Sequence, residues 1–254
     1  MARQTVRLVI IGNEVLSGKV VDSNTPWLLG RLRQIGAVCT GVRVIPDTMD
    51  EVAQTVSGEA GLADWVITTG GVGPTHDDIT MAGIARGFNV AVLEHPSLLT
   101  ILSSHIGGDL TETQRRLARV PAGAELLDGG NFPTVKFRNI FILPGVPALV
   151  RRKFERIEPH FAGDRLPCAA LRTTLRETEL APYLEATLEE VPEADIGSYP
   201  RRGEEGWRVL LTLEAPSREA LDRCLAALLA RLPSETVFDV SQEFRPEDEG
   251  GLRE

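Results

Sequence analysis

The residues best suited to chemistry lie in one loop, residues 70–80, which reads Gly-Gly-Val-Gly-Pro-Thr-His-Asp-Asp-Ile-Thr. Its three glycines leave a bare backbone that a ligand can approach closely. The residues after the loop have a helical pattern, and a glycine loop that leads into a helix N-terminus favours phosphate. Because Asp77 and Asp78 would repel a bare phosphate, the pattern predicts a divalent cation between them and the ligand. The loop is therefore typical of a nucleotide or phosphoester site.

The groups of this loop have distinct expected roles. The backbone amides of Gly71, Val72 and Gly73 are expected to bind the non-bridging oxygens of a phosphate. Asp77 and Asp78 are expected to hold a divalent metal (Mg²⁺, Mn²⁺ or Co²⁺), which would lower the pKa of a bound water molecule. Asp78 could instead serve only as the N-cap of the next helix, a role worth about 1 kcal/mol.

The elements that must position this loop alternate between strand-like and helix-like segments over the first 160 residues. Strands are expected at residues 6–11, 37–45, 65–69 and 139–143, and helices at 22–36, 50–56, 78–85, 96–106, 111–119 and 148–161. Strands separated by helices imply an α/β domain with a mostly parallel sheet that is covered on both faces.

Three glycine-containing loops leave the ends of these strands, at residues 12–18, 70–78 and 144–147. Ligands of open parallel sheets bind beyond the carboxyl ends of the strands, so the three loops are expected to meet at one pocket. Asp47 follows the second strand and would lie at the same edge, unless it is only a turn residue. The residues expected to contact the ligand are Gly12, Asn24, Gly70, Gly71, Val72, Gly73, Thr80, Pro144 and Gly145. The residues expected to be catalytic are Asp47, Asp77 and Asp78.

Composition and charge exclude several classes of protein. The 254 residues, 43% hydrophobic and 25% charged, are typical of a globular protein of one or two domains. A net charge of −9 offers no basic surface for nucleic acid, so no nucleic-acid partner is expected. The three cysteines form no CxxC pair that would indicate a zinc site. No apolar run is long enough for a signal peptide or a membrane span, which predicts a cytoplasmic protein without a membrane partner.

The last third of the chain differs in character. Residues 163–167 are expected to form a linker, so the first domain spans residues 1–162. Residues 168–240 have the order strand, helix, strand, strand, helix, which predicts a smaller α+β domain with two helices on one face of its sheet. The acidic tail, residues 241–254, is expected to be disordered.

Four segments resemble a known family, the CinA-type proteins, in order and spacing. Residues 11–18 with Asp22-Ser23-Asn24 are similar to the start of the family, and residues 142–147 match its LPGVP segment. Residues 70–80 look like its GGxGPTxDDxT signature, with every fixed position present. Residues 110–115 lie where the family usually has a TENN sequence. The resemblance covers residues 5 to about 240.

This resemblance implies a fold and a set of activities. The fold would be the three-layer α/β/α domain of the MogA and MoaB molybdopterin-binding proteins, which carry out adenylyl transfer with magnesium, followed by a KH-like domain. CinA-type domains are associated with ADP-ribose pyrophosphatase activity, and a eukaryotic relative is fused to FAD synthase. Asp78 and Asp47 would match two acidic positions of the relatives' site. The related domains assemble, so a homodimer is expected. The amidase domain that often follows has no counterpart in these 254 residues, so no deamidase activity is expected.

Two functional hypotheses follow. The first is a metal-dependent hydrolase that acts on a nucleotide phosphoanhydride, with ADP-ribose as the expected substrate. The alternative is a non-catalytic module that binds molybdopterin or a nucleotide. The alternative is favoured by residues 130–137, because Phe132 and Val135 stand where the family has small residues that let a ligand lie against the backbone.

Overall fold

The computed structural model describes residues 3–127, 132–201 and 206–242, and the chain divides into two compact units. Unit 1 comprises Met1–Arg165 and unit 2 comprises Leu166–Glu254, so the division falls within residues 163–167. The tail for which disorder is expected lies, from residue 243 onward, outside the described residues. In the described part of the chain, no helix has both the length and the apolar character needed to cross a lipid bilayer.

The sheet of unit 1 confirms the predicted mostly parallel arrangement. The strand order is β2-β1-β3-β8-β7-β6. The parallel strands are β1 (Thr5–Ile11), β2 (Val38–Ile45), β3 (Trp65–Thr69) and β8 (Ile140–Leu143). Two short antiparallel strands, β7 (Thr134–Phe137) and β6 (Glu125–Leu127), extend the sheet beyond β8. These two strands are absent from the sequence-based prediction.

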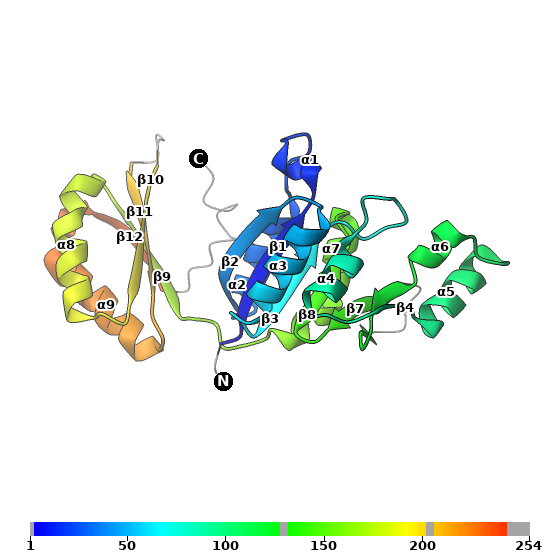
Figure 1. Ribbon diagram of the computed structural model, residues 1–254. Coiled ribbons are helices and arrows are strands. Elements are labelled where there is room, and N and C mark those ends of the chain that lie inside the picture. Colours follow the sequence, from blue (N-terminus) through cyan, green and yellow to red (C-terminus); the bar gives the residue numbers. More distant parts are fainter. Residues whose placement is uncertain (1–2, 128–131, 202–205, 243–254) are drawn as a thin grey trace. The chain divides into compact units, whose positions relative to one another are not determined.

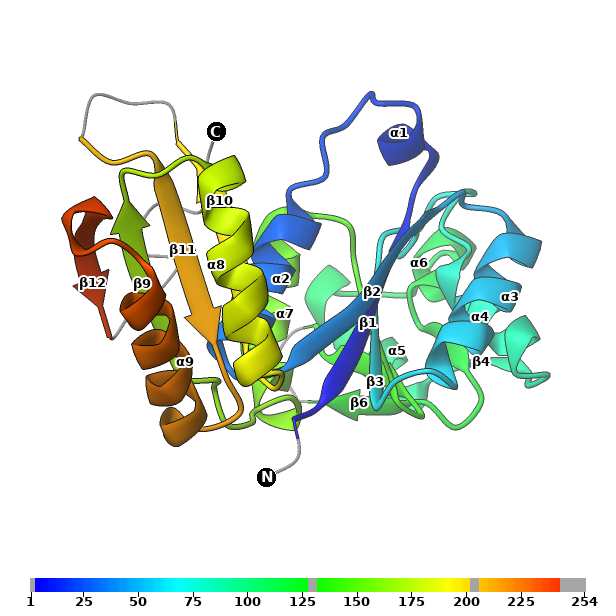
Figure 2. The ribbon, with the colours of Figure 1, turned by 90° about the vertical axis from the view of Figure 1, so that its left-hand side faces the viewer.

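Helices cover both faces of this sheet, which makes the predicted three-layer α/β/α sandwich (Figures 1 and 2). Leu8 and Ile10 of β1 point to one face, where they pack with helices α2 (Asn24–Gln34) and α7 (Pro147–Ile157). Val9 and Ile11 point to the opposite face. That face is covered by α3 (Met49–Ala60) and α4 (Thr80–Gly87), and Leu98 and Leu102 of α5 (Pro96–Ile106) join the same apolar cluster. Because side chains alternate along a strand, a nearly continuous apolar run such as β1 serves two cores at once.

A small ribbon stands beside the main sheet in unit 1. Strands β4 (Val92–Glu94) and β5 (Arg119–Pro121) pair in antiparallel fashion, and the short helix α6 (Glu112–Arg116) precedes β5. A capping box between Thr111 and Gln114 fixes the start of α6. The sequence pattern predicts one helix over residues 111–119, but the helix ends at Arg116 and the next residues enter the ribbon.

Carboxylates lie at the starts of two predicted helices. At the start of the helix expected over residues 22–36, Asp22 accepts hydrogen bonds from the backbone N–H groups of Asn24 (2.9 Å) and Thr25 (3.1 Å), next to the N-cap residue Ser23. Asp78 does not cap α4, because the N-cap residue is Ile79 and no side chain bonds there. The expected loop after β1 also contains a one-turn helix, α1 (Asn13–Leu16).

Unit 2 is an antiparallel sheet with two helices on one face. Its elements are β9 (Cys168–Thr173), α8 (Glu177–Glu190), β10 (Asp195–Pro200), β11 (Val209–Glu214), α9 (Arg218–Arg231) and β12 (Val237–Ser241). The sheet order is β10-β11-β9-β12, and every neighbouring pair is antiparallel. This β-α-β-β-α-β arrangement is the split βαβ topology. The sequence pattern predicts the first five elements but not β12.

Candidate functional site

The site lies at a switch point of the parallel sheet. Strands β1 and β3 are neighbours, but the helix after β1, α2, lies on one face and the helix after β3, α4, lies on the other. At such a point the connecting loops separate and leave a crevice beyond the carboxyl ends of the strands. The loops after β1, β3 and β8 all leave this edge of the sheet, so the structure brings together the three loops singled out by sequence.

The glycines of the loop after β3 are required by its geometry. Gly70 and Gly71 have φ angles of +98° and +59°, in the left-handed region that side chains disfavour. A Cβ atom on Gly70 would lie 2.0 Å from the carbonyl oxygen of Ile11. Thr80, which is fully buried, donates its hydroxyl to Gly70 O (2.8 Å) and its N–H to Gly71 O (3.1 Å). The start of α4 therefore holds the loop in place.

Neighbouring loops are tied to this one by backbone bonds. Gly70 donates its N–H to Leu143 O at the end of β8 (3.2 Å), and Gly12 donates its N–H to Ile45 O at the end of β2 (3.1 Å). Asn24, only 9% exposed, donates its amide Nδ2 to Gly145 O (2.8 Å). Asn24 thus links α2 to the loop after β8, which gives it a structural role at the floor of the crevice.

Replacing Asn24 with alanine is expected to lower the free energy of unfolding by about 0.5–1.5 kcal/mol, because it removes the hydrogen bond that links α2 to the carbonyl of Gly145. Urea unfolding of the two proteins measures this difference. Thr100→Ala is the matched control, since its hydroxyl only bonds the carbonyl of Pro96 within an exposed turn of α5. A loss at Asn24 no larger than the loss at Thr100 would contradict this role.

Three consecutive backbone amides of the loop are free. Within the described part of the chain, the N–H groups of Gly71, Val72 and Gly73 donate no hydrogen bond, whereas those of Gly70, Asp78 and Thr80 do. Successive free N–H groups with a left-handed residue among them form a concave anion-binding nest. These are the amides that the sequence pattern assigns to phosphate.

The paired carboxylates are held by the loop itself. The Thr75 hydroxyl lies within hydrogen-bonding distance of both Asp77 Oδ1 and Asp78 Oδ2, and the Thr75 N–H donates to Asp78 Oδ2 (2.8 Å). The hydrogen bond from Thr75, followed by a backbone bond and the nearby His76, holds the pKa of Asp77 below its usual value. Asp78 lines the crevice, whereas Asp77 is exposed and does not.

Asp47 does not join this pair. Its Oδ1 atom is buried and has no hydrogen-bond partner among the residues that the structure describes. Among the described residues, no three His, Cys, Asp or Glu side chains gather closely enough to form a metal centre by themselves. A cation at Asp77 and Asp78 would therefore take its remaining ligands from water and from a bound phosphate, as Mg²⁺ commonly does.

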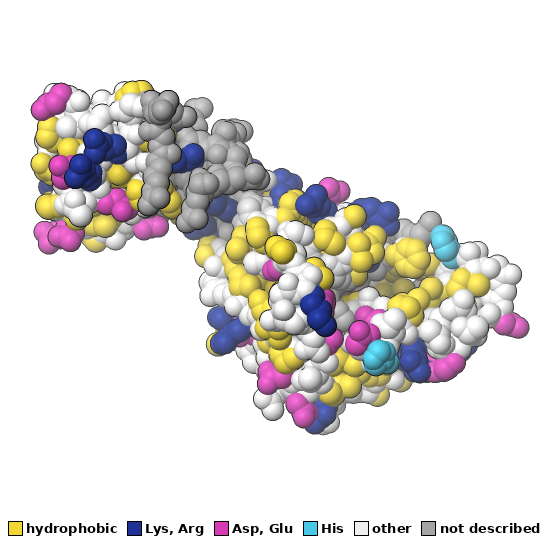
Figure 3. All heavy atoms as spheres, turned by 90° about the horizontal axis from the view of Figure 1, so that it is seen from above, with side chains coloured by type: hydrophobic (Ala, Val, Ile, Leu, Met, Phe, Trp, Pro, Cys, Tyr) yellow, Lys and Arg dark blue, Asp and Glu magenta, His cyan; other side chains and the backbone are white. Residues whose placement is uncertain are grey.

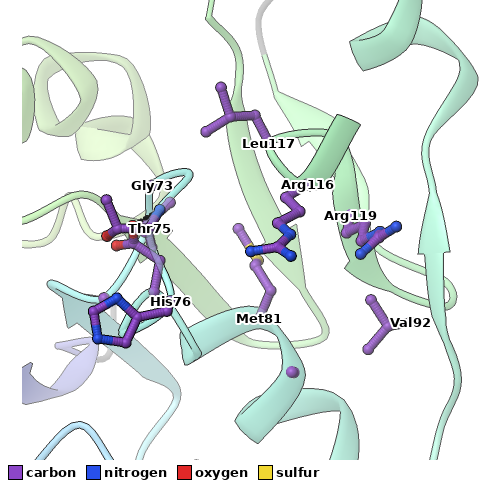
Figure 4. Close-up of a pocket in the computed structure, with 12 residues that line it drawn as sticks. Gly73, Thr75, His76, Met81, Val92, Arg116, Leu117 and Arg119 are labelled. Carbon is purple, nitrogen blue, oxygen red and sulfur yellow. Dashed lines mark hydrogen bonds between the residues drawn. The ribbon is translucent and has the colours of Figure 1, made fainter. Parts of the chain in front are cut away.

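A polar hollow of about 200 Å³ opens in front of the nest and of Asp78 (Figure 4). Arg116 and Arg119 line its opposite wall. The guanidinium of Arg116 points across the hollow toward the glycine loop, while that of Arg119 turns away and pairs with Glu112 and Glu94. Arg116 itself has no hydrogen-bond or ion-pair partner among the described residues. No sequence motif marks Arg116, because only the folding of α6 and the ribbon beside the main sheet brings it to the loop.

A second, apolar hollow of about 360 Å³ adjoins the first. It shares Val72, Gly73, Met81 and Leu117 with the polar hollow, and Pro144 also lines it. Phe132, 44% exposed, stands in its wall without closing it. Figure 3 shows hydrophobic side chains gathered around a hollow on this face of unit 1. Of the expected contact residues, Gly71, Val72, Gly73 and Pro144 line one or both hollows. The other five are not among the described residues that line either hollow: Gly12, Asn24, Gly70, Thr80 and Gly145.

Comparison with known proteins finds relatives of both units. Residues 7–162 match the family model "Probable molybdopterin binding domain", and residues 165–241 match "FAD synthase, middle domain". A protein from Archaeoglobus fulgidus is 31% identical over 77% of this chain and 86% of its own length. A "Probable FAD synthase" from Caenorhabditis elegans is 29% identical over 93% of this chain, which spans only 51% of the nematode protein. A solved structure, CinA of unknown function from Thermoplasma acidophilum, matches 63% of this chain and 98% of its own, with 25% identity and a TM-score of 0.58.

These findings correct one expectation and leave another unconfirmed. The expected metal-dependent hydrolase with ADP-ribose pyrophosphatase activity is wrong, because the family models and the nematode relative point to molybdopterin-binding and FAD synthase-like proteins. A glycine loop followed by carboxylates indicates what is bound, but it does not identify the reaction. The KH-like assignment of residues 168–240 is not confirmed, since this region matches the FAD synthase middle domain and its sheet has a fourth strand, β12.

The CinA resemblance is supported for unit 1 by the match to the Thermoplasma structure. The molybdopterin-binding model spans residues 7–162, which is more than half of the 254 residues. The polar crevice at the switch point of the sheet lies wholly within this matched region. This chain therefore belongs to the family described as "Probable molybdopterin binding domain".

Proposed function

We propose that unit 1 is a binding module for a phosphorylated heterocycle, either molybdopterin or a nucleotide. The ligand's phosphate would lie on the nest amides of Gly71, Val72 and Gly73. The name of the nematode relative, "Probable FAD synthase", favours a flavin nucleotide within this class.

The observation that carries the proposal is the meeting of free donors from two distant segments. Three amides lie on one wall of the polar hollow, and the guanidinium of Arg116 reaches toward them from the other. None of these groups has a hydrogen-bond or ion-pair partner within residues 3–127, 132–201 and 206–242. An arginine binds phosphate through two parallel hydrogen bonds, and backbone amides add donors that need no rearrangement. Donors that face a shared hollow without an acceptor favour an anion between them.

Asp78 gives the same hollow a carboxylate, which a bare phosphate would avoid. With Asp77, it would hold a divalent cation that neutralises the ligand's charge. The two carboxylates and the phosphate oxygens supply a suitable set of oxygen donors for magnesium. The cation is thus proposed as part of the ligand complex, and the affinity for a nucleotide is expected to rise when magnesium is added.

Arg116→Met is expected to weaken the binding of both FMN and AMP at least tenfold, because both carry the phosphate that Arg116 would bind. A charged hydrogen bond is worth about 1.5–3 kcal/mol, which is about a tenfold to hundredfold change in affinity. Flavin fluorescence measures FMN binding and calorimetry measures AMP binding, each with and without magnesium. Arg152→Met is the matched control, since Arg152 is exposed and lines neither hollow.

The proposal fails if the wild-type protein binds neither FMN nor AMP at millimolar concentration in either buffer. It also fails if Arg116→Met and Arg152→Met have equal effects. Thermal-shift curves provide a second readout, because a ligand that binds only the folded state raises its stability with concentration.

A further inference from the structure

The apolar hollow contains one charged side chain among the described residues that line it, Lys153 of α7. Its Nζ atom donates hydrogen bonds to the carbonyl oxygens of Phe132 (3.0 Å) and Pro133 (2.8 Å). An ammonium group has three donors, so these bonds leave one N–H available. The lysine therefore presents a free donor beside walls that are otherwise apolar.

The electrostatic surroundings of Lys153 favour a hydrogen-bond acceptor on a bound ligand. In the described chain it forms no ion pair, and the charges that act on it are those of Arg156 and Arg152 on the same helix. Among its described residues, the facing segment contributes the two carbonyl groups, and His105 contacts Phe132 edge-on with ring centroids 5.7 Å apart. Burial, reinforced by the two arginines, lowers the pKa of Lys153 to about 8. A partly buried cation without a counter-charge is costly, and an acceptor on a ligand would offset that cost.

The position of the hollow relative to the nest indicates what occupies it. Val72 and Gly73 line both hollows, so a phosphate on their amides places the rest of the ligand at the mouth of the apolar one. The walls are formed by Met81, Leu98 and Leu149 with Phe132, and the volume of about 360 Å³ lies in the range of small-molecule sites. A planar ring suits such walls.

We propose that the apolar hollow is the subsite for a heteroaromatic ring that bears a ring carbonyl, and that Lys153 donates a hydrogen bond to that carbonyl oxygen. This inference rests on the proposed function of the polar hollow. Pterin, flavin and guanine rings carry such a carbonyl next to a ring N–H, whereas adenine does not. Lys153 thereby selects among ligands that share the same phosphate anchor.

Lys153→Met tests this selection, because methionine keeps the length and apolar contacts of the stem but removes the ammonium group. At about pH 7, Lys153→Met is expected to weaken FMN binding at least tenfold and to change AMP binding less than twofold. Arg152→Met, which removes a neighbouring charge of the same helix outside the hollow, is expected to leave both affinities within twofold.

The pH profile separates ligand contact from a merely structural role. Lys153 is protonated below a pKa of about 8, so FMN affinity of the wild-type protein is expected to fall as pH rises through that value. The fall should be absent in Lys153→Met and absent for AMP. Wild-type FMN affinity that stays constant across this pH range would overturn the assignment of Lys153 as the donor.

The outcomes distinguish this inference from the function on which it rests. If Lys153→Met weakens FMN and AMP equally, or weakens neither, the ring subsite is overturned while the phosphate site stands. If the wild-type protein binds AMP as tightly as FMN, the selection for a ring carbonyl is overturned. If it binds neither ligand, the proposed function fails and the ring subsite fails with it.

Discussion

Gly70→Ala is expected to lower the free energy of unfolding by about 3 kcal/mol, the largest stability loss of any substitution considered at this site. The φ angle of +98° at Gly70 is one that a residue with a Cβ atom rarely adopts. The added methyl group would also lie 2.0 Å from the carbonyl oxygen of Ile11, which is backbone of the central strand β1 and cannot rotate away. Relief requires β1 and β3 to separate at their carboxyl ends, where Gly70 also bonds Leu143.

Urea unfolding provides the measurement, and Gly30→Ala provides the matched control. Gly30 lies in the middle of α2, and a Cβ atom there would meet nothing within 4 Å. Alanine favours a helix over glycine by about 1 kcal/mol, so the control is expected to gain stability while Gly70→Ala loses it. A Gly70→Ala protein as stable as the wild type would show that the loop after β3 is free to move away from β1.

The parallel core of unit 1 is predictable from sequence because its signals are local. The apolar run of β1 and the start of α2, just after Asp22, are each marked within a few residues. The mostly parallel sheet then follows from the alternation of strands and helices. The glycine loop is identified with equal clarity, because its glycines are required by backbone geometry at Gly70 and Gly71.

Strands and caps that depend on residues distant along the chain, or on the detailed geometry of a loop, are not predicted correctly from the sequence. Strands β4 to β7 are three or four residues long, and they are stabilised by pairing with one another or with β8. Segments this short show no alternation of apolar and polar residues from which a strand could be predicted. The predicted helical cap at Asp78 is wrong for a related reason, since its carboxylate bonds back to Thr75 within the loop and Ile79 takes the cap position. Strand β12 similarly needs β9 as its partner.

The same reasoning explains which site residues sequence analysis overlooks. Arg116 lies opposite the nest only because the fold places α6 and the ribbon of β4 and β5 beside the glycine loop. Lys153 extends from α7 into the wall of the apolar hollow, where it bonds the carbonyl groups of Phe132 and Pro133. Neither residue lies in a motif. Asp47, in contrast, is singled out by sequence because it follows β2, but it forms no cluster with Asp77 and Asp78 among the described residues.

Gly73→Ala is expected to weaken the binding of FMN and AMP about a hundredfold while leaving the protein folded. Gly73 has no left-handed φ angle, so alanine is compatible with its backbone. A Cβ atom there would, however, lie 2.5 Å from Asp78 Oδ2, and the carboxylate would have to move. That movement breaks the bond between Asp78 and Thr75, which shapes the nest, and places the methyl group beside the free amides.

The size of this effect follows from the number of donors affected. Each hydrogen bond to a charged phosphate is worth about 1.5–3 kcal/mol, and loss of the nest geometry weakens at least two of them. Gly108→Ala is the control, because Gly108 is exposed outside both hollows and a Cβ atom there meets nothing within 4 Å. Far-ultraviolet circular dichroism verifies folding, and the titrations with FMN and AMP measure affinity. Unchanged affinity in a folded Gly73→Ala protein would show that the phosphate does not lie on these amides, and would leave Arg116 as an anchor without a partner.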